Sequence, residues 1–194
     1  METQDFSTAP PCRRTILKNS VKTSLAFVVG AIVGNGGKPS GARAQSMDGQ
    51  ASILHIAMNV ADLERTTRFY TEAFGFTASP PITPDAQAAR IFGLPEPLEI
   101  KARIISLGTA RILLRQFDKP SYTGPARDLP VTYPGWGDIA LRIGNMDEVL
   151  AKVRRLGGTV LENTRTIEGT PQKRGPEVVF VTDPDGARVE LVSF

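Results

Sequence analysis

The chain contains one histidine, His55, and one cysteine, Cys12. His55 stands in the segment SILHIAMNV (52–60). A similar segment, GWGDIALRI (135–143), has Asp138 at the matching place before a shared Ile-Ala pair. Imidazole nitrogens and carboxylate oxygens transfer protons and bind divalent metals. A single histidine excludes sites that need two, such as H-E-x-x-H, and neither a G-x-S-x-G nor a Walker A motif is present. The chemistry therefore depends on what shares a face with His55 and Asp138.

The first 44 residues have the features of an export signal. Arg13 and Arg14 precede an apolar run at 24–34, and the sequence A-R-A follows at 42–44. Such a combination is typical of a secretory leader, and the paired arginines resemble a bacterial twin-arginine signal. We expect a periplasmic or secreted mature protein that begins near Gln45; the alternative is a disordered tail. The apolar run is too short to span a membrane, so no stable membrane association is expected after the leader is removed.

Removal of the leader changes the charge and the thiol content. The whole chain has 23 basic and 20 acidic residues. Residues 1–44 hold six of the basic and two of the acidic ones, which leaves 17 and 18 in residues 45–194. A nearly neutral chain without a basic block does not favour nucleic-acid binding. Cys12 is lost as well, which excludes disulfides, thiolate zinc sites and cysteine nucleophiles from the single domain at 45–194.

That domain contains a tandem repeat. HIAMNVADLERTTRFYTEAFGF (55–76) parallels DIALRIGNMDEVLAKVRRLGGTV (138–160), and each is an alternating strand followed by an amphipathic helix. TARILLRQF (109–117) and GARVELVSF (186–194) match as closing strands. Each half has room for two more strands, near 76–80 and 102–107 in the first and near 159–163 and 177–182 in the second. The pattern predicts two βαβββ modules, at about 52–117 and at 138–194, joined by a linker at 118–137.

Local signals mark where these elements begin and end. Gly75 is placed to end the first helix, and Asn145 with Glu148 predicts a capping box at the start of the second. The first half also inserts a predicted short helix, TPDAQAARIFG (83–93), capped by Thr83. The sequence DPDG at 183–186 predicts the turn into the last strand.

Strand alternation determines which side chains share a face. In the repeated strands the apolar residues alternate with His55 and Asp138, so the apolar side is expected to pack on the helix and the other side to be open. The same alternation in the closing strands places Leu113 and Glu190 on the open side. These four residues are therefore equivalent, inward-facing positions of the two halves. Further residues on the open faces include Arg115, Phe117 and Arg142, with Arg111 and Arg188 nearer the edge.

A doubled βαβββ unit with HIAMNV…RFYTEAFGF early and DPDGARVEL at the end resembles the vicinal oxygen chelate superfamily, over residues 52–194. That superfamily includes glyoxalases, bleomycin-resistance proteins, extradiol dioxygenases and methylmalonyl-CoA epimerases. The resemblance implies an α+β fold in which two tandem βαβββ modules form a cupped mixed β-sheet with helices on the outer face. In metal-using members the four ligands come from the first and last strands of each half. Those positions are His55, Leu113, Asp138 and Glu190 here.

The implied ligand set is altered in this chain. His55 and Glu190 match the family in type, Asp138 is a replacement that still offers oxygen, and Leu113 cannot bind a metal. One imidazole and two carboxylates suit a divalent Mn, Fe or Ni ion better than a closed structural Zn site, although Zn also binds such ligands. Leu113 leaves coordination positions for water or a bidentate substrate, and Glu190 is the expected catalytic residue. The alternative is a site without metal, in which Asp138 pairs with an inward arginine.

Two functions follow from the resemblance. One is a metal-dependent lyase, isomerase or dioxygenase acting on a small oxygen-rich anionic compound, which Arg115, Arg142, Leu113 and Phe117 would contact. The other is a metal-free protein of the bleomycin-resistance type that binds and sequesters a small molecule. Export separates the protein from the mainly cytosolic glutathione pool, which disfavours a glutathione substrate. Many relatives dimerise, and the sequence leaves a homodimer open.

Overall fold

The structure is a computed structural model that describes residues 51–84, 91–122, 132, 134–170 and 173–194. All of them belong to one compact unit of residues 36–194. The expected export signal, much of the linker and most of the short helix expected at 83–93 lie outside the described residues. Within the described part of the chain, no helix is both long enough and apolar enough to cross a membrane.

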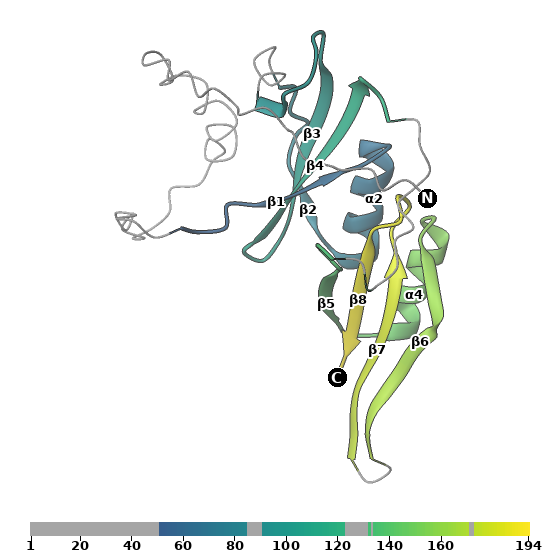
Figure 1. Ribbon diagram of the computed structural model, residues 1–194. Helices are drawn as coiled ribbons and strands as arrows, with labels where there is room; N and C mark the ends of the chain where they lie inside the picture. Colours follow the sequence, from purple (N-terminus) through teal and green to yellow (C-terminus); the bar gives the residue numbers. More distant parts are fainter. Residues whose placement is uncertain (1–50, 85–90, 123–131, 133, 171–172) are drawn as a thin grey trace, which may run out of the picture. The chain divides into compact units, whose positions relative to one another are not determined.

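Module one forms a four-stranded mixed sheet covered by one helix (Figure 1). The strands lie in the order β1-β4-β3-β2, with β1 parallel to β4 and the other pairs antiparallel. Asp62 caps the helix by accepting a hydrogen bond from the Arg65 backbone N at 2.9 Å. Gly75 ends it with a φ of 77°, a conformation that favours glycine, as predicted. The elements are β1 (Ile56–Asn59), α2 (Leu63–Phe74), β2 (Thr77–Ala78), β3 (Glu99–Leu107) and β4 (Ala110–Lys119).

Module two repeats this arrangement in the strand order β5-β8-β7-β6. The Asn145 side chain accepts from the Glu148 backbone N at 3.1 Å, which is one half of the predicted capping box, while the Glu148 carboxylate pairs with Lys152. β6 and β7 are longer than the sequence predicted, and β8 pairs only with Glu177–Thr182 of β7. The α+β fold with two tandem βαβββ modules is confirmed. The elements are β5 (Ile139–Ile143), α4 (Met146–Arg155), β6 (Thr159–Thr170), β7 (Lys173–Thr182) and β8 (Arg188–Ser193).

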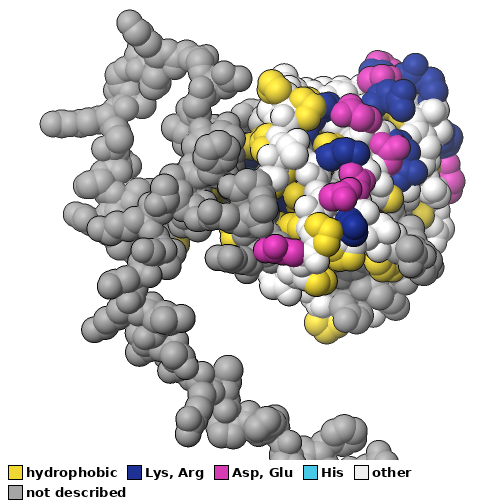
Figure 2. Space-filling view, turned by 90° about the horizontal axis from the view of Figure 1, so that it is seen from above, with side chains coloured by type: hydrophobic (Ala, Val, Ile, Leu, Met, Phe, Trp, Pro, Cys, Tyr) yellow, Lys and Arg dark blue, Asp and Glu magenta, His cyan; other side chains and the backbone are white. Residues whose placement is uncertain are grey.

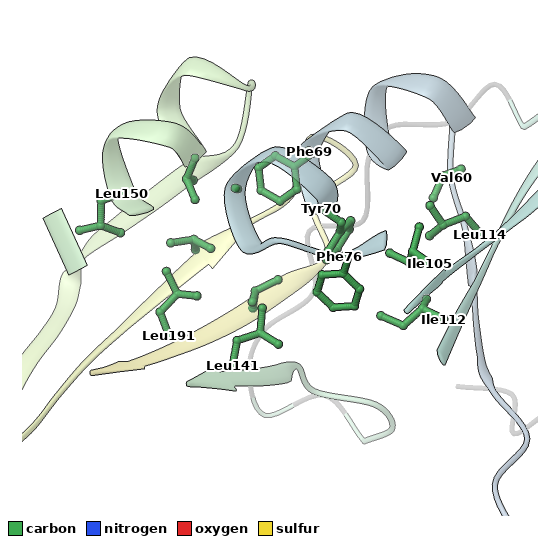
Figure 3. Packing of buried hydrophobic residues seen from close by; sticks show 14 of the residues in the cluster. Val60, Phe69, Tyr70, Phe76, Ile105, Ile112, Leu114, Leu141, Leu150 and Leu191 are labelled. Atoms are coloured by element: carbon green, nitrogen blue, oxygen red, sulfur yellow. The ribbon is translucent and has the colours of Figure 1, made fainter. Parts of the chain in front are cut away.

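The helix-covered sides of both sheets share one hydrophobic core (Figure 3). Phe69 and Tyr70 of α2 are fully buried in it, together with Leu150 of α4 and Leu191 of β8. Burying side chains of this size contributes about 1.5–3 kcal/mol each. Gly158 lies so close that an added Cβ would be 2.6 Å from the Phe69 ring. The two modules are therefore packed through their helix sides.

The DPDG turn adds a polar connection between the modules. The Asp185 carboxylate accepts hydrogen bonds from the Arg65 guanidinium at 2.5 Å and the Thr66 hydroxyl at 2.7 Å, both on α2. Asp183 is 2% exposed and accepts from the backbone N of Asp185 and Ala187, and from the Tyr70 hydroxyl at 3.3 Å. The sequence predicted only a turn here. In the structure, both carboxylates also contact module one.

Charges of both signs are mixed on the surface. On the face seen in Figure 2, basic and acidic side chains lie next to one another. Two of the exposed pairs illustrate this, Lys152 with Glu148 at 2.8 Å and Arg155 with Glu72 at 3.7 Å. Such exposed pairs contribute little to stability. This face therefore does not present the single-sign surface that attracts nucleic acid.

Candidate metal and ligand site

The first and last strands of the two modules pair in the same register. Ala57 is opposite Leu113 in module one, and Ala140 is opposite Glu190 in module two. His55 and Asp138 each precede these alanines by two residues, so each lies on the same face as the residue opposite. The structure therefore has the twofold equivalence of His55 with Asp138 and of Leu113 with Glu190 that the sequence predicted.

On module one, His55 is half-buried, and its buried Nδ1 atom has no hydrogen-bond partner among the described residues. Burial lowers the pKa of His55, and the nearby positive charge of Arg115 lowers it further. The imidazole is therefore neutral at pH 7, which is the form that binds a metal. Leu113 is buried beside it, 7% exposed, and offers no ligand atom.

On module two, Asp138 is exposed and Glu190 is half-buried. Among the described residues, neither carboxylate forms an ion pair. The Arg142 guanidinium carbon instead lies 4.2 Å from the centroid of the Phe194 ring, a cation–π contact. The ion pair between Asp138 and an arginine, on which the metal-free alternative in part depended, is absent from the described part of the chain.

The described residues do not bring the candidate ligands together within one chain. No group of three His, Cys, Asp or Glu side chains among them is placed to hold one ion, and His55, Asp138 and Glu190 are all described. The reason is the packing of the modules, since their helix-covered sides share the core and the ligands lie on the opposite faces of the sheets. Each module thus carries part of the ligand set.

Module one also carries a cluster of Arg115, Phe92 and Phe117. The Arg115 guanidinium carbon lies 5.0 Å from the Phe92 ring centroid and 6.0 Å from that of Phe117. The two rings meet edge to face with their centroids 5.4 Å apart. Arg115 is half-buried, and burial lowers its pKa. Strand alternation predicted Arg115 and Phe117 on this face. It missed Phe92, which belongs to the segment inserted between β2 and β3.

The doubled βαβββ fold defines a class of proteins, and comparison with known proteins shows that this chain belongs to that class. Residues 52–191 match the model of the Glyoxalase/Bleomycin resistance protein/Dioxygenase superfamily, and the chain belongs to that family, as the sequence motifs predicted. A lactoylglutathione lyase from Escherichia coli O157:H7 is 29% identical over 141 residues, which are 72% of this chain and 90% of that protein. A lactoylglutathione lyase from Arabidopsis thaliana is 30% identical over 143 residues, 72% of this chain but 43% of the relative.

Solved structures show the same fold. A glyoxalase family protein from Bacillus cereus superposes with a TM-score of 0.62 at 18% identity, covering 78% of this chain and 98% of that one. Glyoxalase I from Zea mays has a TM-score of 0.50 at 20% identity, covering 73% of this chain and 44% of the other. At these identities the likeness establishes the fold, and the chemistry has to be argued from the residues.

Proposed function

We propose that this chain is an exported, metal-dependent member of its superfamily, a lyase, isomerase or dioxygenase acting on a small oxygen-rich anionic compound. The matched register of the two modules supports the proposal. In this register one imidazole and two carboxylates occupy corresponding positions on the two open faces. These groups are ligands for divalent Mn, Fe, Ni or Zn. A bound ion of this kind polarises substrate oxygens as a Lewis acid. The similarity to lactoylglutathione lyases supports an isomerase or lyase reaction.

The ligand set is complete only if two copies combine. We infer a homodimer in which the open face of module one in one copy covers the open face of module two in the other. The ligand atoms are complementary, since module one offers the His55 imidazole and no acidic residue on the same face of β1, β3 or β4, whereas module two offers the carboxylates of Asp138 and Glu190. Twofold symmetry creates two such sites in each dimer.

The side chains of this chain have separate roles in the proposed site. Neutral His55 and the carboxylates of Asp138 and Glu190 hold the ion, and Glu190 also accepts and returns a proton of the substrate. Leu113 offers no ligand and so leaves positions at the ion open to substrate oxygens. The remaining side chains of the site contact the substrate: Arg115, Arg142 and Phe117.

Subunit mixing tests the proposal. His55→Ala and Glu190→Ala are each expected to lose bound metal, measured by mass spectrometry of the gel-filtered protein. The two variants are then mixed so that subunits exchange. A dimer of one His55→Ala copy and one Glu190→Ala copy has one site with both substitutions and one site with neither. Random exchange should therefore restore about one quarter of the wild-type metal content. Ligands that combine within one chain would give no recovery. The exposed Asp147→Ala is the matched control and should keep full metal content.

A metal-free binding protein is the second candidate. Leu113, in place of a ligand, and the Arg115 cluster beside it favour this function. Wild-type protein that holds no Mn, Fe, Ni or Zn after purification, yet binds small molecules, would establish it. Near-stoichiometric metal would exclude it.

Export is tested independently of the site. Changing Arg13 and Arg14 to Lys should retain the precursor in the cytoplasm, because twin-arginine export depends on the pair. Fractionation followed by immunoblotting measures this. Unchanged export of the double variant would refute the twin-arginine assignment, and the wild-type chain in the cytoplasm would refute export altogether.

A further inference from the structure

Arg115 is a charged residue with Asn59 opposite it on β1 and an apolar wall on its other side. On its face of module one, Ala102 lies opposite it on β3, and Ile104 and Leu113 lie one pair further along. These three neighbours are all buried, with at most 8% exposure. Removing a guanidinium from water costs free energy unless a partner replaces the lost hydration. A partner is therefore expected.

The described part of the chain supplies no anionic partner. Within the described ranges, the Arg115 Nε atom is buried without a hydrogen bond, and its guanidinium forms no ion pair. Its contacts are the rings of Phe92 and Phe117, which fix the orientation of the guanidinium plane but do not neutralise it. Other arginines of the described residues do have carboxylate partners: Arg65, Arg103, Arg154, Arg155 and Arg165.

We propose that Arg115 binds the carboxylate of an amphiphilic organic acid whose apolar body lies against Phe92, Phe117 and Leu113. A single half-buried guanidinium matches a monoanion better than a doubly charged phosphate. The buried apolar residues around it match a hydrocarbon or aromatic body rather than a sugar or a nucleotide. Phe92 becomes a specificity residue, because it contributes a wall of the site from outside the sheet.

This inference deepens the proposed function by naming the class of ligand, and it rests on that function for the place of the ligand. Binding of a carboxylate to Arg115 itself requires no metal. It can therefore be measured on metal-stripped protein, so that its outcome is read separately from the metal content. The metal content measured in the mixing experiment is likewise unaffected by Arg115.

The test is calorimetric titration of EDTA-dialysed full-length protein with phenylacetate and its neutral analogue phenylacetamide. Wild type should bind the acid at least about tenfold more tightly than the amide, a difference of about 1.4 kcal/mol. Arg115→Met should abolish this preference, and Phe92→Ala should weaken both ligands equally. Arg111→Met is the matched control, since Arg111 is exposed on the same strand and face, and it should behave as wild type.

Arg115→Lys guards against loss of folding in Arg115→Met. Lysine keeps the charge but lacks the planar fork, so its preference for the acid should fall between those of wild type and Arg115→Met. Two results would overturn the proposal. One is wild type binding the amide as well as the acid, or binding neither. The other is an unchanged preference in folded Arg115→Met or, if that variant does not fold, in Arg115→Lys.

Discussion

The open faces of the two modules have the same backbone geometry but different chemistry. Module one carries an imidazole and, beside the buried Leu113, a guanidinium without a carboxylate partner among the described residues. Module two carries Arg142 and two carboxylates, of which Asp138 is exposed. Duplication of a βαβββ unit accounts for the shared register. Under the proposed function the two halves divide the work, with ligand recognition mainly on module one and most of the metal ligation on module two.

Removing the exposed carboxylate of Asp138 is expected to have the largest effect on metal binding. Asp138→Ala should lower metal affinity by more than about 100-fold, because even loss of a group behind the ligands costs 10- to 100-fold. Without metal, its unfolding free energy should change by less than about 0.5 kcal/mol, as for an unpaired surface residue. Metal titration and urea unfolding measure the two quantities.

Asp138→His is the companion to that variant. It should keep or strengthen Zn binding, since imidazole is a good zinc ligand. If Asp138 served instead as the counter-charge of an arginine, both variants would lose stability, by roughly 3–5 kcal/mol for a fully buried pair. An equal loss with and without metal, in a wild type that binds none, would refute the ligand assignment.

Making the two faces alike is the converse experiment. Leu113→Glu gives module one the carboxylate that module two has at Glu190, and it should raise metal affinity by about tenfold or more. Leu113→Gln is the matched control, because it replaces the same buried side chain without a charge. Both should lose about 1–3 kcal/mol of stability in the absence of metal. Equal metal affinities in the two variants would show that residue 113 does not face the ion.

The elements were predictable because their signals are local. Alternating apolar residues marked the strands, and Gly75 and Asn145 marked the helix ends that the structure has. The equivalence of His55 with Asp138 followed from strand parity, which requires no knowledge of how the modules pack.

What could not be predicted depends on contacts between distant segments. Phe92 lies in an insertion without strand alternation, so no pattern assigns its ring to Arg115. The sequence DPDG identifies a turn, but the contact of Asp185 with Arg65 joins residues 120 positions apart. The separation of His55 from Asp138 and Glu190 depends on the packing of whole modules through their helix sides.

The β-hairpin turns also differ between the two modules. In module one, β3 and β4 are joined by a short turn containing Gly108, whereas in module two Asp183 is buried in the turn between β7 and β8. Burial is the main cause that raises the pKa of Asp183, to about 6, and the Asp185 charge contributes. The proton is thus held more tightly in the folded state than in the unfolded one. Stability from this residue is present below about pH 4 and is lost as the pH rises through 6.

Asp183→Asn should therefore be more stable than wild type at pH 7.5, by up to about 3 kcal/mol, with the difference vanishing near pH 4. The amide oxygen still accepts the two backbone hydrogen bonds, and its NH₂ group can donate to the Tyr70 hydroxyl. Urea unfolding of both proteins between pH 4 and 8 measures the effect. Asp185→Asn is the control, which should lower stability at pH 7.5 because Arg65 loses its partner. A less stable Asp183→Asn at every pH would contradict the assignment.

The smallest effect is expected at the extended β6–β7 ribbon, which has no counterpart in module one because β2 has only two residues. Arg165 joins this ribbon to α4 through ion pairs with Glu177 at 2.6 Å and Asp147 at 2.8 Å. Asp147 is 82% exposed, so water and salt screen its pair strongly. Arg165→Gln should lower the melting temperature slightly in low salt and not at all in 1 M salt. A loss that persists in high salt would mean that the Arg165 stem packs on the ribbon, and that packing rather than charge holds this feature of module two in place.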